Sequence, residues 1–112
     1  MVHASSDSYK LENILSSLRI ELAHLLGKQL DAVYLYGSQA RGDAQPESDI
    51  DTLIVLREDF NYFDMIERTA DITAKLSLEN DVVISSAFTS ADNFQHLQTP
   101  FLINVRREGI QV

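Results

Sequence analysis

The stretch YGSQARG at residues 36–42, followed by SDID at 48–51 and the apolar run LIVL at 53–56, decides how this chain folds. A nearly continuous apolar run of this length is typical of a central strand that is buried on both faces. The glycine and serine of the upstream loop allow the backbone to turn and to approach a ligand closely. The stretch therefore predicts a small-residue loop beside two acidic residues that begin a buried strand.

The two acidic residues of this stretch, Asp49 and Asp51, lie two positions apart. Side chains alternate between the faces of a strand, so both carboxylates are expected to point the same way. Two carboxylates held together repel each other unless a cation relieves the repulsion. Magnesium takes oxygen ligands, and one or two carboxylates plus substrate phosphates commonly hold it. We therefore interpret Asp49 and Asp51 as Mg²⁺ ligands.

The loop at Gly37 and Ser38 supplies the features of a phosphate-binding site. Glycine permits unusual backbone dihedrals, and amides at the start of the following short helix can point at a phosphate. The Ser38 hydroxyl can add a hydrogen bond. Arg41, one turn further, could reach a phosphate or could instead pair with Asp43 or Asp49. Gly37, Ser38 and Arg41 are therefore the candidate nucleotide-binding residues.

Hydrophobic periodicity and turn residues predict the elements around this stretch. The predicted helices cover residues 9–26, 38–42 and 61–76, and two more begin at Ser90 and at Thr99-Pro100, the last ending at Gly109; the predicted strands cover 32–36, 50–56, 82–84 and 110–112, and 44–48 is a loop. Alternation of helices and strands is typical of an α/β domain. We expect a small mixed β-sheet with helices packed on it.

Composition limits the functions that the chain can have. With 112 residues we expect one domain, spanning residues 1–112. A net charge of −8 argues against binding long nucleic acids, which requires many Lys and Arg residues, and favours a basic protein partner. The absence of cysteine excludes disulfides, and no apolar run is long enough to span a membrane. The cytoplasm is the expected location.

The motif formed by Gly37-Ser38, ten intervening residues and Asp49-x-Asp51 resembles the signature of the minimal nucleotidyltransferases of the DNA polymerase beta superfamily. The intervening Arg41-Gly42 and Ser48 also fit that pattern, and the resemblance covers nearly the whole chain. It implies a polymerase beta-like nucleotidyltransferase core. It also implies that Asp49 and Asp51 bind the metal and that Gly37 and Ser38 hold the triphosphate of a nucleotide such as ATP.

Members of this family usually carry a third carboxylate on the next strand, and two positions compete for it here. Asp81 is the only acidic residue in the segment 81–86, and it would then help to deprotonate the acceptor as a third catalytic residue beside Asp49 and Asp51. A register that follows Thr89-Ser90 would instead place Ser85 there. The two positions are four residues apart, roughly 13 Å along a strand, so they cannot replace each other.

The resemblance implies transfer of a nucleoside monophosphate, AMP foremost, from a triphosphate to a second substrate. No additional module is present to bind an acceptor, so we expect the acceptor to be a partner protein. Small members of this family often act as antitoxins that adenylylate a tyrosine of an all-helical RNase toxin. The alternative is a catalytically impaired module that neutralises a partner by binding, and transfer to a small molecule is a weaker third option.

Overall fold

The computed structural model describes residues 6–43 and 49–112, and its side chains from Lys10 onward outside the gap. The expected loop at 44–48, including Ser48, lies outside the described residues. The elements follow the order α1 (Ser6–Leu26), a 3₁₀ turn (Gly27–Gln29), β1 (Leu30–Tyr36), α2 (Ser38–Arg41), β2 (Ile50–Leu56), α3 (Tyr62–Asn80), β3 (Ile84–Ser90), α4 (Ala91–His96), α5 (Pro100–Glu108) and β4 (Ile110–Gln111).

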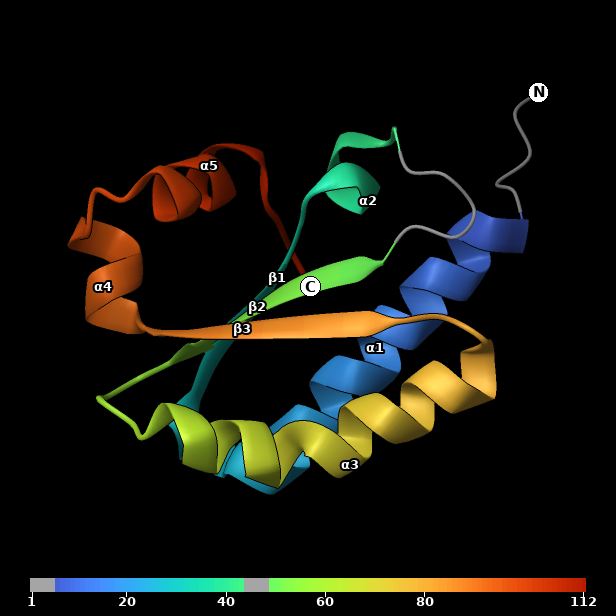
Figure 1. Cartoon of the computed structure of the whole chain (residues 1–112), viewed down its shortest axis with the longest axis horizontal. Helices are drawn as coiled ribbons and strands as arrows, with labels where there is room; N and C mark the ends of the chain where they lie inside the picture. Colours follow the sequence, from blue (N-terminus) through green and yellow to red (C-terminus); the bar gives the residue numbers. More distant parts are fainter. Residues whose placement is uncertain (1–5, 44–48) are drawn as a thin grey trace.

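The four strands form one mixed sheet in the order β3-β2-β1-β4 (Figure 1). Strand β1 pairs antiparallel with β2 and with β4, whereas β2 pairs parallel with β3. The parallel pair requires a crossover, and α3 makes it along one face of the sheet. The expected α/β architecture with a small mixed sheet is confirmed.

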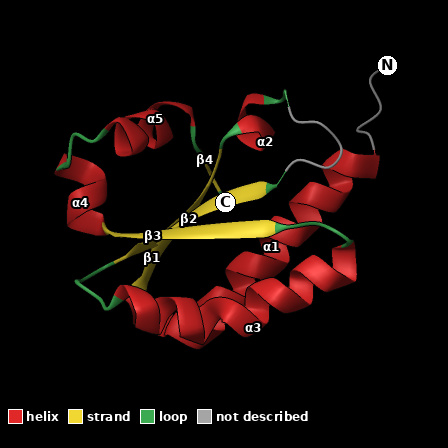
Figure 2. Cartoon of the chain, viewed as in Figure 1, coloured by secondary structure: helices red, strands yellow, loops and turns green. Residues whose placement is uncertain are grey.

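Different helices cover the two faces of the sheet (Figure 2), and an apolar core lies on each face. Helices α1 and α3 cover one face, where Leu18 packs with Ile54 of β2. The second core takes Leu53 and Val55 of β2 and residues of α5 such as Leu102. Because successive residues of β2 point to opposite faces, the part of the strand that is covered on both sides, residues 53–56, is apolar throughout. This explains why residues 50–56 were the clearest strand in the sequence.

Side-chain caps begin three of the helices. The side chains of Asn61, Ser90 and Thr99 accept hydrogen bonds from the backbone amides of Asp64, Asn93 and Leu102 at 2.9, 3.1 and 3.2 Å. Each cap satisfies an amide that has no partner within its own helix. The helix starts predicted at Ser90 and at Thr99-Pro100 are confirmed.

Strand β3 lies elsewhere than the sequence predicted. The prediction placed it at residues 82–84, but it runs from Ile84 to Ser90. The error arose because this edge strand is rich in small polar residues, so the short apolar run before it gave the stronger signal. Helix α3 caps its outer edge: the amide of Ile84 donates to Ser77 Oγ at 3.2 Å, and the amide of Phe88 donates to Tyr62 Oη at 3.3 Å.

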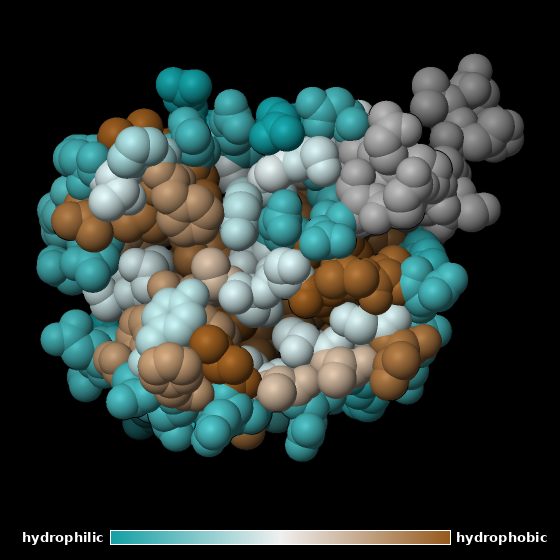
Figure 3. Space-filling model, viewed as in Figure 1, coloured by the Kyte–Doolittle hydropathy of each residue, from teal (hydrophilic) through white to brown (hydrophobic). Residues whose placement is uncertain are grey.

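The outward face of α3 carries exposed apolar side chains, visible as brown and tan patches along this helix in Figure 3. Phe63 is 80% exposed, Leu78 is 84% exposed, and Ile66 lies exposed between them. Phe63 and Ile66, one turn apart, form an exposed apolar patch of the kind that can mark a binding surface for a protein. Within the described part of the chain, no helix is both long and apolar enough to cross a lipid bilayer.

Candidate active site

Two acidic residues stand at the start of β2, where the sheet pairing brings three chain segments together. Asp51 lies opposite Tyr36 at the end of β1 and opposite Ser85 of β3. Directly paired residues of neighbouring strands point to the same face of a sheet. These three side chains therefore share one face, which is the face that α4 and α5 partly cover. Asp49 is exposed two residues before Asp51.

The phosphate-loop candidate lies directly against this acidic pair. Gly37 has φ +73° and ψ −155°, a conformation that is essentially restricted to glycine. A Cβ atom placed on Gly37 would lie 2.6 Å from Asp51 Oδ2, which leaves no space for any other residue. The loop therefore lies close to Asp51, as one shared site would require. Ser38 follows immediately and begins α2.

Of the two competing third positions, the structure brings Ser85 to the acidic pair. The Ser85 hydroxyl donates to Asp49 Oδ2 at 3.5 Å, the long end of the hydrogen-bond range. Asp81 instead ends α3 as its C-cap, with a left-handed φ of +53° and an exposed side chain. It precedes β3, so the register does not align it with Asp51. The prediction that Asp81 stands beside Asp49 and Asp51 is therefore corrected.

The site perturbs the ionisation of two of its groups. Burial, and then the charge of Asp49, raise the pKa of Asp51 above its ordinary value of 3.8. Burial, followed by the charge of Asp51 and the neighbouring Tyr62, raises the pKa of Tyr36 above 10.0. Both shifts follow from negative charge held in a partly desolvated position. The Tyr36 phenol therefore stays protonated next to the acids, and a bound cation would relieve the repulsion.

The repulsion predicts a stability gain when Asp51 is neutralised. Because the folded chain holds the Asp51 proton more tightly than the unfolded chain, its free energy of unfolding falls as pH rises through the raised pKa. In the absence of divalent ions, Asp51→Asn should raise that free energy at neutral pH by about 0.5 kcal/mol, a small value because the group is largely solvated. The gain should vanish only well below pH 3.8, the ordinary pKa, where the carboxyl is protonated in both the folded and the unfolded chain.

Urea denaturation of both proteins in EDTA at the two pH values measures this gain. Asp71→Asn is the matched control, because Asp71 is exposed on α3 and has no place in the acidic pair. A loss of stability in Asp51→Asn at neutral pH would show that the carboxylate makes favourable contacts which outweigh the repulsion.

Arg41 lies at the end of α2 with an exposed side chain. Its Nε atom donates to Asp43 Oδ2 at 3.3 Å, and its Nη1 atom lies 3.8 Å from Glu108 Oε2. The pairing with Asp43 was one of the alternatives open from the sequence. Exposed ion pairs of this kind contribute little to stability. Arg41 can therefore exchange its acidic partners for a phosphate.

A pair of aromatic rings borders the site, and the sequence did not indicate that these two rings meet. The rings of Tyr36 and Phe101 meet edge to face, with centroids 5.2 Å apart. In the sequence, strand alternation favours a core role for Tyr36, although its place beside the loop could let it touch a base, and the helical pattern says nothing of Phe101. Ser85 is the other neighbour of the acids. The sequence indicated its position only through a register that follows Thr89-Ser90 downstream. All three depend on how β1, β3 and α5 come together.

The donor set suits one magnesium ion. Asp49 and Asp51 offer two carboxylates, which is the share that proteins commonly give to Mg²⁺ bound with substrate phosphates. Because Gly37 lies against Asp51, phosphates bound at this loop would lie beside the carboxylates. Among the described residues, no group of three or more Asp, Glu, His or Cys side chains could hold a metal. The two carboxylates thus fit a Mg²⁺ site whose remaining ligands come from the nucleotide.

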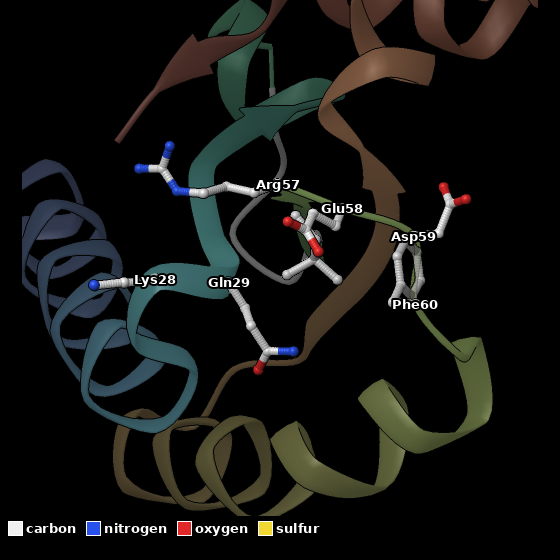
Figure 4. Close-up of a pocket in the computed structure, with 7 residues that line it drawn as sticks. Lys28, Gln29, Arg57, Glu58, Asp59 and Phe60 are labelled. Atoms are coloured by element: carbon white, nitrogen blue, oxygen red, sulfur yellow. The ribbon is translucent and has the colours of Figure 1, made fainter.

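A pocket of about 340 Å³ lies elsewhere, at the opposite end of β2 (Figure 4). It is lined by the apolar Leu56 and Phe60 and by charged side chains of both signs, including Lys28, Arg57 and Asp59. Arg57 follows Asp51 by six residues, roughly 20 Å along a strand at about 3.3 Å per residue. Pocket size therefore does not locate the candidate active site, which the acids and the glycine loop define.

Comparison with known proteins identifies the family. The family described as "Polymerase beta, Nucleotidyltransferase" matches residues 10–105. The chain belongs to this family of nucleotidyltransferases, whose members are typically metal-dependent. Two similar proteins of Methanocaldococcus jannaschii, MJ0141 and MJ0604, are assigned as protein adenylyltransferases. MJ0141 is 30% identical over 99 residues, which are 88% of this chain and 95% of that protein. MJ0604 is 39% identical over 82 residues, which are 72% of this chain and 76% of that protein.

Solved structures share the fold. A toxin-antitoxin complex with AMP-PNP contains a chain that matches with a TM-score of 0.62 and 22% identity, over 89% of this chain and 70% of that one. A structure assigned as a minimal nucleotidyltransferase matches with a TM-score of 0.59 and 22% identity, over 91% and 95%. A nucleotidyltransferase assigned in Sulfolobus solfataricus matches with a TM-score of 0.57 and 20% identity, over 99% and 89%. The expected polymerase beta-like fold is confirmed.

Proposed function

We propose that this chain transfers AMP from ATP to a hydroxyl group of a partner protein. One observation carries the proposal: the Asp51 carboxylate touches Gly37, so a single triphosphate can reach both the acidic pair and the glycine loop. The protein adenylyltransferases assigned in Methanocaldococcus jannaschii, 30% and 39% identical, support the choice of AMP and of a protein acceptor.

Each site residue has a role in this reaction. Asp49 and Asp51 hold Mg²⁺, while Gly37, Ser38 and Arg41 bind the triphosphate. Magnesium supplies stabilisation of the negative charge that develops on the phosphate oxygens. The acceptor oxygen forms a bond to the α-phosphorus as the bond from that phosphorus to the bridging oxygen breaks. Pyrophosphate leaves with the electron pair, and the hydroxyl proton passes to solvent.

The acceptor that best suits this site is a tyrosine. With Ser85 beside Asp49, no third carboxylate stands ready among the described residues to take a proton from the acceptor. A phenol has a pKa near 10 and loses its proton far more easily than an aliphatic hydroxyl does. Tyrosine therefore depends least on a protein base.

A basic protein is the partner that the surface favours. The chain has a net charge of −8, and opposite charges steer partners together. The exposed apolar face of α3, with Phe63 and Leu78, provides an area for such a protein to dock. We propose that the chain is an antitoxin and that the partner is an all-helical RNase toxin. The fold shared with a toxin-antitoxin complex supports this role.

Radiolabelled ATP tests the proposed reaction. The chain is incubated with Mg²⁺ and the protein encoded by the neighbouring reading frame, in parallel with α-labelled and γ-labelled ATP. We expect the partner to acquire label from α-labelled ATP alone, since AMP keeps only the α-phosphorus. Label from γ-labelled ATP would indicate phosphate transfer instead. The experiment is then repeated with variants of the partner in which each exposed tyrosine is replaced by phenylalanine. One of these variants should no longer acquire the label.

A second candidate function follows from Ser85. Without a third carboxylate the chain could neutralise its partner by covering it, with no transfer at all. The two candidates are separated by a toxicity assay with Asp49→Asn. Adenylylation requires that this variant loses neutralisation, whereas occlusion requires that it retains it while the partner stays unlabelled with every nucleoside triphosphate.

A further inference from the structure

We propose that the exposed ring of Phe101 is the surface on which the base of the bound nucleotide stacks. The proposal deepens the proposed function, on which it rests for the place of the triphosphate. It gives helix α5 a second role: besides covering the sheet, the helix binds the part of the nucleotide that the acids and the glycine loop do not reach.

Helix α5 runs beside the loop that binds the triphosphate (Figure 1). Near the start of the helix, the ring of Phe101 meets the ring of Tyr36, with centroids 5.2 Å apart. Tyr36 is the residue directly before Gly37. At the end of the helix, Glu108 Oε2 lies 3.8 Å from Nη1 of Arg41, the last residue of α2. Helix α5 is therefore next to the segment 36–41 at both ends of that segment.

The acids and α5 also share one face of the sheet. Asp51 pairs with Tyr36 across β2 and β1, and paired residues project from the same face. Leu102 and Val105 of α5 are buried in the core on that face. These contacts anchor the helix, so it keeps its place when Arg41 turns to a phosphate. A triphosphate that reaches from the loop to Asp51 therefore lies beside α5.

The ring of Phe101 combines contact with the site and access from solvent. Phe101 is 41% exposed although its ring touches a residue that borders the loop. Among the described residues, the other exposed aromatic side chains are Tyr62 and Phe63, which begin α3 on the opposite side of the sheet (Figure 2). Tyr34 and Phe94 already stack on each other, with centroids 4.7 Å apart. Phe101 is therefore the described ring beside the loop that offers free surface.

A nucleoside triphosphate has the reach and the chemistry for this surface. One edge-to-face contact separates Phe101 from Tyr36, which adjoins the loop, and one sugar separates the phosphates of a nucleotide from its base. Bases stack favourably on aromatic side chains, and stacking tolerates different bases because each of them has a π-face. Phe101 therefore strengthens the binding of ATP and GTP alike, and the choice between them depends on other contacts.

Calorimetry with two probes tests this role. The full chain is titrated, in Mg²⁺, with a non-hydrolysable ATP analogue and with inorganic tripolyphosphate, which carries the phosphates without a base. Phe101→Leu keeps an apolar side chain and removes the π-face. We expect it to bind the ATP analogue about tenfold more weakly, the effect of losing one stacked base, and to bind tripolyphosphate as the wild type does. The corresponding GTP analogue should lose the same factor, and Phe101→Trp should restore the affinity for both.

Phe63→Leu is the matched control, because this ring is 80% exposed but lies on α3. Its affinity for both probes should equal that of the wild type. An equal loss for both probes in Phe101→Leu would mean that the ring only shapes the loop. Unchanged affinity for the ATP analogue would mean that the base lies elsewhere, and either result would overturn the proposal.

These binding measurements need no acceptor protein. If the expected pattern appears while the partner stays unlabelled, the proposed transfer is wrong and the stacking surface stands. If the partner acquires AMP while Phe101→Leu binds the ATP analogue normally, the transfer stands and the stacking surface is wrong. A wild type that binds neither probe would overturn both proposals, since both require the triphosphate to bind at the loop.

Discussion

Asp51→Asn should lower the rate of AMP transfer by about 10³-fold while the protein remains folded. The loss is large because the Asp51 carboxylate both holds the metal and lies against the loop that binds the triphosphate. Stabilisation of charge at the reacting phosphate is a major part of catalysis. Asp49→Asn should have a similar effect. Initial rates of incorporation from α-labelled ATP measure the loss, and thermal unfolding verifies the fold.

Asp81→Asn is the matched control for both variants. Its carboxylate belongs to the same residue type but lies at the C-cap of α3, away from the pair. Its rate should stay within about twofold of the wild type, the usual range for an exposed residue outside the site. A loss comparable to that of Asp51→Asn would mean that Asp81 joins the acids during the reaction, which would contradict the assignment of Ser85 to the third position.

Gly37→Ala should abolish nucleotide binding and destabilise the fold. Two causes act together: the backbone conformation at φ +73° strains any residue with a Cβ, and that atom would come within 2.6 Å of Asp51 Oδ2. The strain corresponds to about 1–3 kcal/mol of stability. Displacing either the loop or the carboxylate separates the phosphate-binding and metal-binding halves of the site. We expect at least a hundredfold weaker binding of an ATP analogue by calorimetry, in keeping with a loss of about 2.7 kcal/mol.

Gly27→Ala separates strain from contact. Gly27 also has a positive φ, +54°, but an added Cβ there would have no atom within 4 Å. This variant should lose about 1–2 kcal/mol of stability, the strain of a left-handed residue, and should bind the nucleotide as the wild type does. Equal nucleotide affinity in both variants would show that the contact between Gly37 and Asp51 does not organise the site.

The sequence predicted the parts of the site that a single segment determines. Residues 53–56 are apolar without interruption, because β2 is covered on both faces, and the strand has the bounds Ile50–Leu56 that the sequence predicted. The two-residue spacing of Asp49, directly before β2, and Asp51, within it, likewise predicts a common direction from a single segment. Helix starts at Ser90 and Thr99 could be predicted because a cap depends on residues only three positions apart.

The parts that depend on pairing between distant segments could not be predicted in this way. Whether Asp81 or Ser85 stands beside the acids depends on the register of β3 against β2, and the polar composition of 85–90 conceals the strand. The meeting of Tyr36 with Phe101 requires α5 to pack over β1, sixty-five residues later in the chain. Local periodicity carries no information on such contacts.

The two hydroxyl caps on β3 also determine how other proteins can meet this chain. An edge strand normally offers a row of backbone amides that can recruit a foreign strand, whether from a ligand or from an aggregating copy. Here Ser77 and Tyr62 already occupy the amides of Ile84 and Phe88. With these two outward amides occupied, β3 offers a foreign strand fewer hydrogen-bond partners, which disfavours extension of the sheet on this side.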